Sequence, residues 1–264
     1  MEIVHPRSIE EAIAGLSDGV VPLAGGTDLM VEVNFGHVRP ENVVGLRRLE
    51  PLREWDGSRI GAGVTWRRIE KEGPTALAEA ARTVGSPQIR NAGTIGGNLG
   101  TASPAGDGHP FLAAVDASIE LTSAGGSRLV AWDEFFVGVK KTARAPDELI
   151  TAVELPDALP ERQAFGKIGI RNAMVIATVC AVVTRSEDGR TTVGLGSVAP
   201  TPIRAPRAET MISSVAKPTD TDLAEFQRLV SEEVRPITDH RSTEEYRRHG
   251  AGVLARRLLE RCLR

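Results

Sequence analysis

Cysteine and aromatic residues are scarce in this sequence. Its 264 residues include two cysteines, one tyrosine, three tryptophans and six phenylalanines. An iron–sulfur cluster takes four cysteine ligands, so this chain cannot hold such a cluster by itself. The shortage of aromatic rings also argues against a protein that stacks nucleic-acid bases. We therefore expect a core built mainly from aliphatic side chains.

Long apolar runs and an excess of one charge are lacking as well. No stretch approaches the roughly 20 apolar residues that a membrane-spanning helix needs. Residues 1–6 show neither the basic nor the apolar region of a signal peptide. The net charge of −3 gives nucleic-acid binding no electrostatic support. These absences favour a cytoplasmic protein, in which Cys180 and Cys262 are not expected to form a disulfide.

Helix-like and strand-like patterns follow one another without regular alternation. Helical spacing of apolar residues marks segments 9–16, 75–84, 110–115, 223–234 and 242–258. Strand-like segments are 19–23, 58–64, 118–131 (a hairpin), 165–183 and 191–199. Residues 43–70 read as alternating short strands and turns, and residues 101–107 are too rich in turn residues for regular structure. This order predicts an α+β fold rather than a doubly wound sheet.

Two glycine pairs dominate the chain. Gly25 and Gly26 lie in the segment 23–28, and Gly96 and Gly97 lie in the segment 94–98. Glycine lets a backbone approach a ligand closely and adopt a positive φ, so either segment could wrap a diphosphate. Either one alone could be an ordinary turn, and neither matches the P-loop or the Rossmann pattern. Together they predict one dinucleotide held from two sides.

Residues that could bind a metal or act as nucleophiles show no pattern as distinct as the two glycine pairs. Asp107, His109 and Asp116 could suggest a metal site, but their surroundings read as loops, and we predict no metal ligand. There is no Gly-x-Ser-x-Gly elbow, and neither cysteine has a catalytic context. These patterns indicate neither a metal site nor a nucleophilic residue.

Several segments carry a family resemblance that covers essentially the whole chain. The chain resembles the medium, FAD-binding subunit of molybdenum hydroxylases, the family of carbon monoxide dehydrogenase and xanthine dehydrogenase. Residues 23–28 resemble the first flavin loop of that family, and residues 91–98 resemble the second almost letter for letter. The further segments that resemble the family are 102–107, 165–171, 195–202 and 239–248. The chain is short for the family, and Gly106 before Asp107 departs from its pattern.

The resemblance implies a fold and a set of cofactor contacts. Residues 1–55 and 56–160 would be the two subdomains of a vanillyl-alcohol-oxidase-like FAD-binding fold, with FAD between them. Residues 161–264 would form a C-terminal domain of the carbon monoxide dehydrogenase flavoprotein type. Asp107 would accept hydrogen bonds from the cofactor, and Lys167 would favour electron density on the pyrimidine edge of the flavin. The cofactor-binding residues implied are Leu23, Ala24, Gly25, Gly26, Thr27, Asp28, Val84, Thr94, Ile95, Gly96, Gly97, Asn98, Asp107, Ile150 and Lys167.

The resemblance also implies a function. The chain would be an oxidoreductase subunit that takes electrons from a small partner subunit with two [2Fe-2S] clusters. It would pass them through FAD to NAD⁺, oxygen or a quinone, while a large partner subunit holds molybdopterin and oxidises the substrate. In that role the chain needs no residue that removes a proton from a substrate, so the resemblance implies no catalytic residue here. Two alternatives are a stand-alone FAD-dependent oxidoreductase on the same fold and an assembly protein that has lost FAD.

Overall fold

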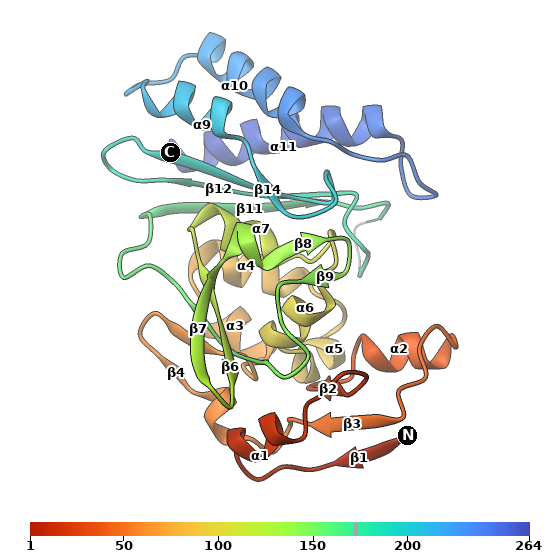
Figure 1. Cartoon of the computed structure of the whole chain (residues 1–264). Coiled ribbons are helices and arrows are strands. Elements are labelled where there is room, and N and C mark those ends of the chain that lie inside the picture. Colours follow the sequence, from red (N-terminus) through yellow and green to blue (C-terminus); the bar gives the residue numbers. More distant parts are fainter. Residues whose placement is uncertain (172–173) are drawn as a thin grey trace.

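The computed structural model describes residues 1–171 and 174–264 and confirms the α+β class. In Figure 1 the chain forms layers: the C-terminal helices, an antiparallel sheet, a group of central helices, and a small sheet at the N-terminal end. The structure has no helix long and apolar enough to cross a membrane in the residues it describes.

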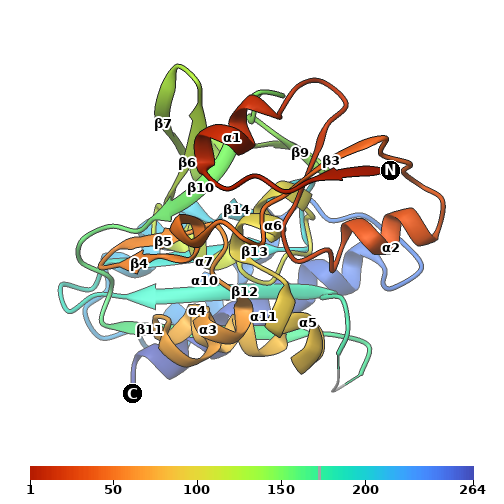
Figure 2. The same cartoon turned by 90° about the horizontal axis from the view of Figure 1, so that it is seen from below.

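The N-terminal region contains a small parallel sheet. Its strands are β1 (Glu2–Val4), β3 (Asn42–Gly45) and β2 (Val21–Leu23), in that order across the sheet. Helix α1 (Ile9–Ala14) begins at Ser8, whose hydroxyl accepts a hydrogen bond from the Glu11 amide. Helix α2 (Leu29–Asn34) follows the first glycine pair and has no buried residue. Figure 2 shows α2 at the edge of the molecule.

The central region is built on a five-stranded antiparallel sheet. Its order is β4 (Trp55–Asp56), β5 (Arg59–Gly61), β10 (Leu149–Glu154), β6 (Ser118–Ser123) and β7 (Gly126–Ala131). The region also contains the helices α3 (Trp66–Glu72), α4 (Thr75–Thr83), α5 (Pro87–Ala92), α6 (Ile95–Thr101) and α7 (His109–Ala114). Short elements complete it: η1 (Glu50–Arg53), α8 (Trp132–Phe135), β8 (Phe136–Gly138) and β9 (Lys141–Thr142).

The C-terminal region contains a second antiparallel sheet covered by helices. Its strands are β11 (Arg162–Ile168), β12 (Val179–Arg185), β13 (Thr191–Gly196) and β14 (Ile203–Arg204), and its helices are α9 (Pro206–Ser213), α10 (Asp220–Glu233) and α11 (Glu244–Cys262). Every residue of β12 is buried, because helices pack on both faces of the strand. Side chains of Cys180 and Val182 enter the central core, and those of Ala181 and Val183 enter the C-terminal core, as the two-residue period of a strand requires.

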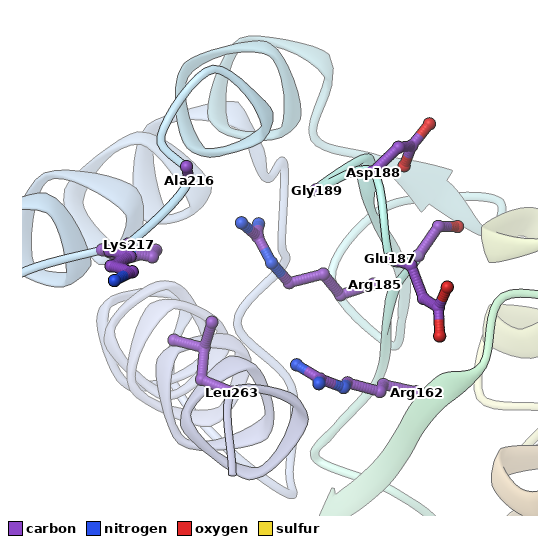
Figure 3. Close-up of a pocket in the computed structure, with 10 residues that line it drawn as sticks. Arg162, Arg185, Glu187, Asp188, Gly189, Ala216, Lys217 and Leu263 are labelled. Carbon is purple, nitrogen blue, oxygen red and sulfur yellow. The ribbon is translucent and has the colours of Figure 1, made fainter.

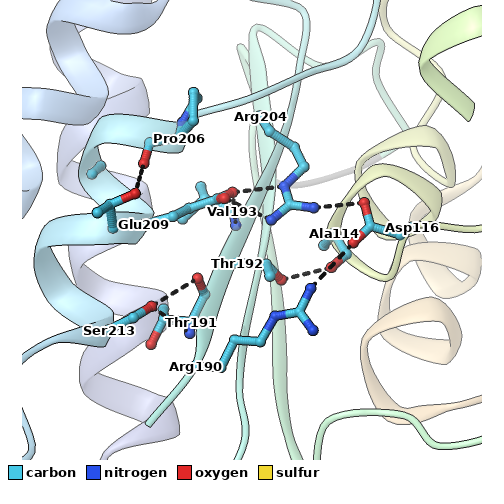
Figure 4. Close-up of polar contacts among 12 residues, drawn as sticks. Ala114, Asp116, Arg190, Thr191, Thr192, Val193, Arg204, Pro206, Glu209 and Ser213 are labelled. Carbon is cyan, nitrogen blue, oxygen red and sulfur yellow. Dashed lines mark hydrogen bonds and ion pairs between the residues drawn. The ribbon is translucent and has the colours of Figure 1, made fainter.

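Helix α7 packs closely against β13 and joins the central and C-terminal regions. A Cβ on Gly194 would lie 1.8 Å from the Pro110 carbonyl oxygen, so only glycine allows this approach. The Thr192 hydroxyl donates to the Ala114 carbonyl at 2.6 Å. Arg204 pairs with both Asp116 and Glu209, at 2.6 Å each (Figure 4). These contacts hold β13 and β14 against α7.

Among the described residues, four helices of six or more residues were not expected from the sequence. Residues 66–72, 87–92, 95–101 and 206–213 form α3, α5, α6 and α9. Each has six to eight residues, and α6 contains three glycines, so intrinsic helix propensity is weak and tertiary packing decides. The strand expected over 165–183 is interrupted between Ile168 and Val179, and residues 172–173 of it lie outside the described residues.

Candidate functional site

The first glycine segment forms an open loop between β2 and α2. Gly26 adopts a φ of +70°, which favours glycine. Among the described residues, the amides of residues 25–28 donate no hydrogen bond. Successive amides without acceptors, next to a residue with positive φ, form a concave nest that binds anions. This segment therefore has the geometry expected of a phosphate-binding loop.

The second glycine segment differs from expectation, because it is the first turn of helix α6. The Ile95 amide donates to the Val64 carbonyl at 3.0 Å, and the Gly96 amide donates to the Ala62 carbonyl at 2.9 Å. The amides of Gly97 and Asn98 donate to the hydroxyl and the carbonyl of Thr94, the residue that caps the helix. The amides of 95–98 already have acceptors, so they are not an open cradle for a diphosphate.

The two glycine segments lie against each other, although Gly25 and Gly96 are 71 residues apart in the sequence. A Cβ on Gly25 would lie 1.9 Å from the Ala92 carbonyl oxygen. Farther along, the Thr101 hydroxyl donates to Asp28 Oδ2 at 3.0 Å. A Cβ on Gly97 would have only Thr94 Oγ1 at 3.2 Å and Ala24 Cβ at 4.0 Å near it. Gly97 thus lines the space between the segments.

Lys167 and Asp107 form a buried ion pair where β11 meets the central helices. Lys167 Nζ lies 2.6 Å from Asp107 Oδ2, and their side chains are 9% and 8% exposed. The Thr83 hydroxyl also donates to Asp107 Oδ2, at 3.1 Å. Burial raises the pKa of the Asp107 carboxyl, although Lys167 and Thr83 act in the opposite direction.

Two buried oxygen atoms in this part of the molecule have no hydrogen-bond donor among the described residues. They are Asp107 Oδ1 and Asn98 Oδ1. A buried acceptor without a donor costs about 1–3 kcal/mol. A bound molecule that brings hydrogen-bond donors would remove this cost at both atoms.

The remaining predicted site residues lie near the two glycine segments or near the Lys167–Asp107 pair. Leu23 ends β2, and its carbonyl oxygen accepts a hydrogen bond from the Leu46 amide. Val84 directly follows Thr83 at the end of α4. Ile150 is 7% exposed, and its Cδ1 is 3.8 Å from the position of a Cβ on Gly100 of α6. The sequence interpretation did not include Thr83, and nothing but its place beside Val84 points to it.

Arg90 is a second residue that the sequence interpretation missed. It is 8% exposed, and its Nη1 donates to the carbonyls of Val84 and Gly85 at 3.3 and 3.0 Å. Its Nε donates to Glu70 at 3.0 Å. Burial opposes ionisation of Glu70, but the guanidinium groups of Arg67 and Arg90 hold the pKa of this carboxyl below its usual value. Arg90 thereby fixes the turn that follows Thr83.

Asp107, His109 and Asp116 do not come together as metal ligands. Asp107 pairs with Lys167, and Asp116 pairs with Arg204. His109 Nδ1 lies 3.0 Å from the Ser103 carbonyl oxygen, and burial lowers the pKa of the imidazole to about 4, so the ring is neutral. The unusual Gly106 is explained by this ring, because a Cβ there would lie 2.4 Å from it. Among the described residues, no three His, Cys, Asp or Glu side chains are placed to hold a metal.

Comparison with known families and proteins gives consistent matches over the whole chain. Residues 1–158 match the family model of the FAD binding domain in molybdopterin dehydrogenase. Residues 164–262 match the model of the CO dehydrogenase flavoprotein C-terminal domain. The carbon monoxide dehydrogenase medium chain of Afipia carboxidovorans is 32% identical, over 97% of this chain and 94% of that protein. The nicotinate dehydrogenase FAD-subunit of Eubacterium barkeri is 38% identical, over 67% of this chain and 66% of that protein.

Solved structures agree with these matches. A chain of the cyanide-inactivated form of Cu,Mo-CO dehydrogenase superposes with a TM-score of 0.90 and 31% identity, covering 99% of this chain and 97% of that one. A chain of quinoline 2-oxidoreductase from Pseudomonas putida 86 gives a TM-score of 0.90 at 26% identity, covering 99% of this chain and 96% of that one.

Proposed function

The chain belongs to the family of FAD-binding medium subunits of molybdenum hydroxylases, and on this premise we propose that it is the electron-transfer subunit of such an enzyme. It would receive electrons from a small partner subunit with two [2Fe-2S] clusters and deliver them through FAD to an external acceptor such as NAD⁺, oxygen or a quinone. A large partner subunit would bear molybdopterin and oxidise the substrate. The chain would work in the cytoplasm.

The residues of this chain fit FAD. The amides of residues 25–28 suit a diphosphate, because they are grouped and have no acceptor among the described residues. The buried oxygens of Asn98 and Asp107 suit hydrogen-bond donors of the cofactor. The whole predicted set, residues 23–28, 94–98, Val84, Asp107, Ile150 and Lys167, is proposed to line the site.

One observation carries the proposal: the buried Lys167–Asp107 pair has one carboxylate oxygen without a donor among the described residues. When bound, FAD supplies the ability to take up electrons singly and release them in pairs. Lys167 is held by Asp107 and by the Thr83 carbonyl at 3.4 Å, so its positive charge stays fixed. A fixed cation stabilises negative charge that develops near it. No group on the chain has to remove a proton from a substrate.

The test begins with the purified full chain. We expect a yellow protein that releases FAD on denaturation, and a complex from its source that contains molybdenum and iron–sulfur clusters. A colourless protein without extractable FAD would contradict the flavin site. A yellow protein without molybdenum- or iron-bearing partners, which oxidises a substrate by itself, would instead support a stand-alone FAD-dependent oxidoreductase.

A further inference from the structure

A cavity of about 540 Å³ lies in the C-terminal region, away from the proposed flavin site. Its cationic lining residues are Arg162 on β11, Arg185 on β12, and Lys217 in the connection between α9 and α10. Lys167 is five residues from Arg162 on the same strand, which corresponds to about 17 Å at the usual rise of a strand.

Arg185 is unusual among the buried arginines of the described residues. Arg90 and Arg247 are also buried, and each has a carboxylate partner, Glu70 and Asp239. Arg185 is 3% exposed, and its contacts are with neutral groups: the Thr191 hydroxyl and two backbone carbonyls at the end of α9. Burying a charge without an ion-pair partner is unfavourable. Burial and the charge of Arg162 lower the pKa of this guanidinium; Asp188 acts in the opposite direction but forms no ion pair with it among the described residues.

The arginines also lie directly opposite each other on neighbouring strands. The register of the β11–β12 hairpin pairs Arg162 with Arg185. Like charges at directly opposite positions destabilise a sheet. Arg162 Nη1 donates to the Cys262 carbonyl at 3.3 Å, at the end of α11. The C-terminal end of a helix carries roughly half a negative charge, so the end of α11 offsets only part of the positive charge of Arg162 and Arg185.

The side chains are oriented as an anion site requires. Figure 3 shows the guanidinium groups of Arg162 and Arg185 directed into the space that Lys217 and Leu263 border. Glu187 and Asp188 also line the cavity, but their carboxylates are directed away from the guanidinium groups. The turn that carries these acids lies against the Arg185 guanidinium. At Gly189, which has a φ of +90°, a Cβ would be 3.3 Å from Arg185 Nη2. The turn therefore packs directly against the buried cation.

We propose that this cavity binds a small phosphate-class anion, which Arg162, Arg185 and Lys217 hold together. The volume is in the range of small-molecule sites and would accept a phosphate group with a short organic part. The anion would give Arg185 the ion-pair partner that it lacks among the described residues and would relieve the repulsion between the opposite arginines.

The experiment measures binding of inorganic phosphate and of glycerol phosphate to the full chain by calorimetry, with sodium chloride at matched ionic strength as the reference. We expect saturable binding that weakens about tenfold in Arg162→Gln and in Lys217→Gln, because each variant loses a charge-assisted hydrogen bond. Arg257→Gln, which removes an exposed charge elsewhere on α11, should bind as the unmodified chain does.

The outcomes separate the possibilities. Binding of both probes indicates a phosphorylated metabolite as ligand, and binding of inorganic phosphate alone indicates the free ion. No saturable binding, or equal weakening in Arg257→Gln, would overturn the proposal. FAD content is measured in the same samples, so a failure of this site is distinguishable from a failure of the flavin site.

Discussion

At the scale of single residues, the glycines of the two pairs differ in what surrounds them. Gly25 and Gly96 pack against protein, because a Cβ on either would lie within 3 Å of a backbone carbonyl oxygen. Gly97 faces the space between the two segments and is exposed. We therefore expect Gly96 to be needed for folding and Gly97 for binding.

Replacing Gly97 by valine should lower the FAD content of the purified chain. The branched side chain would occupy the space between α6 and Ala24, where the backbone is expected to approach the cofactor. FAD content is measured after denaturation, and the thermal midpoint is measured to detect unfolding. Gly125→Val is the control, since a Cβ in that hairpin turn would meet only Ser123 Oγ at 3.6 Å. Unchanged FAD content in Gly97→Val would mean that the segment is merely structural.

Replacing Lys167 by methionine should destabilise the chain by about 3–5 kcal/mol, because Asp107 would be left as an uncompensated buried charge. Urea unfolding of the variant measures this loss. The double variant Lys167→Met/Asp107→Leu should recover most of it, since no isolated charge remains. If the single variant were as stable as the unmodified chain, the pair would not be buried as described.

At the scale of elements, helix α11 is anchored at its first turns by Arg247. This side chain is 4% exposed and donates to the carbonyls of Thr178 and Ser197 and to Asp239 Oδ1, at 2.7, 2.9 and 2.8 Å. It therefore joins the start of β12, the end of β13 and the loop before α11. Burial opposes ionisation of Asp239, but amides of the loop and Arg247 lower the pKa of its carboxyl to about 2.

This anchor predicts a loss of stability in acid. Folding lowers the pKa of Asp239, so the ionised carboxylate stabilises the folded state. This stabilisation is complete at pH values above the ordinary aspartate pKa of 3.8, and it is lost as the pH falls through about 2. The contribution is about 2 kcal/mol at neutral pH. Urea unfolding between pH 5 and pH 2 should show a smaller acid-dependent loss in Asp239→Asn than in the unmodified chain. Parallel pH profiles of the two proteins would refute this.

At the scale of the whole molecule, the central and C-terminal regions are joined by a close backbone contact between α7 and β13. Gly194→Ala should destabilise the chain by about 1–3 kcal/mol or more, because its Cβ would overlap the Pro110 carbonyl. Limited proteolysis should then cleave near residues 156–161, between the two regions. Gly138→Ala, where a Cβ would meet only Lys141 at 3.9 Å, is the control and should resist cleavage. Equal resistance of both variants would show that this contact does not hold the regions together.

Much of the architecture follows from local sequence. The helices α1, α4, α7, α10 and α11 were expected because each has apolar residues at helical spacing, and the β6–β7 hairpin because a glycine turn separates two strand-like runs. The family, the FAD cofactor and the α+β class were also predicted from sequence, and the comparisons confirm them. The division at residues 55 and 160, and the list of cofactor contacts, stay predictions.

The sequence by itself determined which backbone segments are able to approach a ligand, because glycine has no side chain to keep a ligand away from the backbone. Only the tertiary structure decided how each segment is used. The amides of 95–98 are taken by Val64, Ala62 and Thr94, whereas those of 25–28 have no acceptor among the described residues. The tertiary structure likewise decided that Thr83 and Lys167 both donate hydrogen bonds to Asp107. Hydrogen bonds between distant segments depend on packing, and local sequence does not encode which partner a donor will meet.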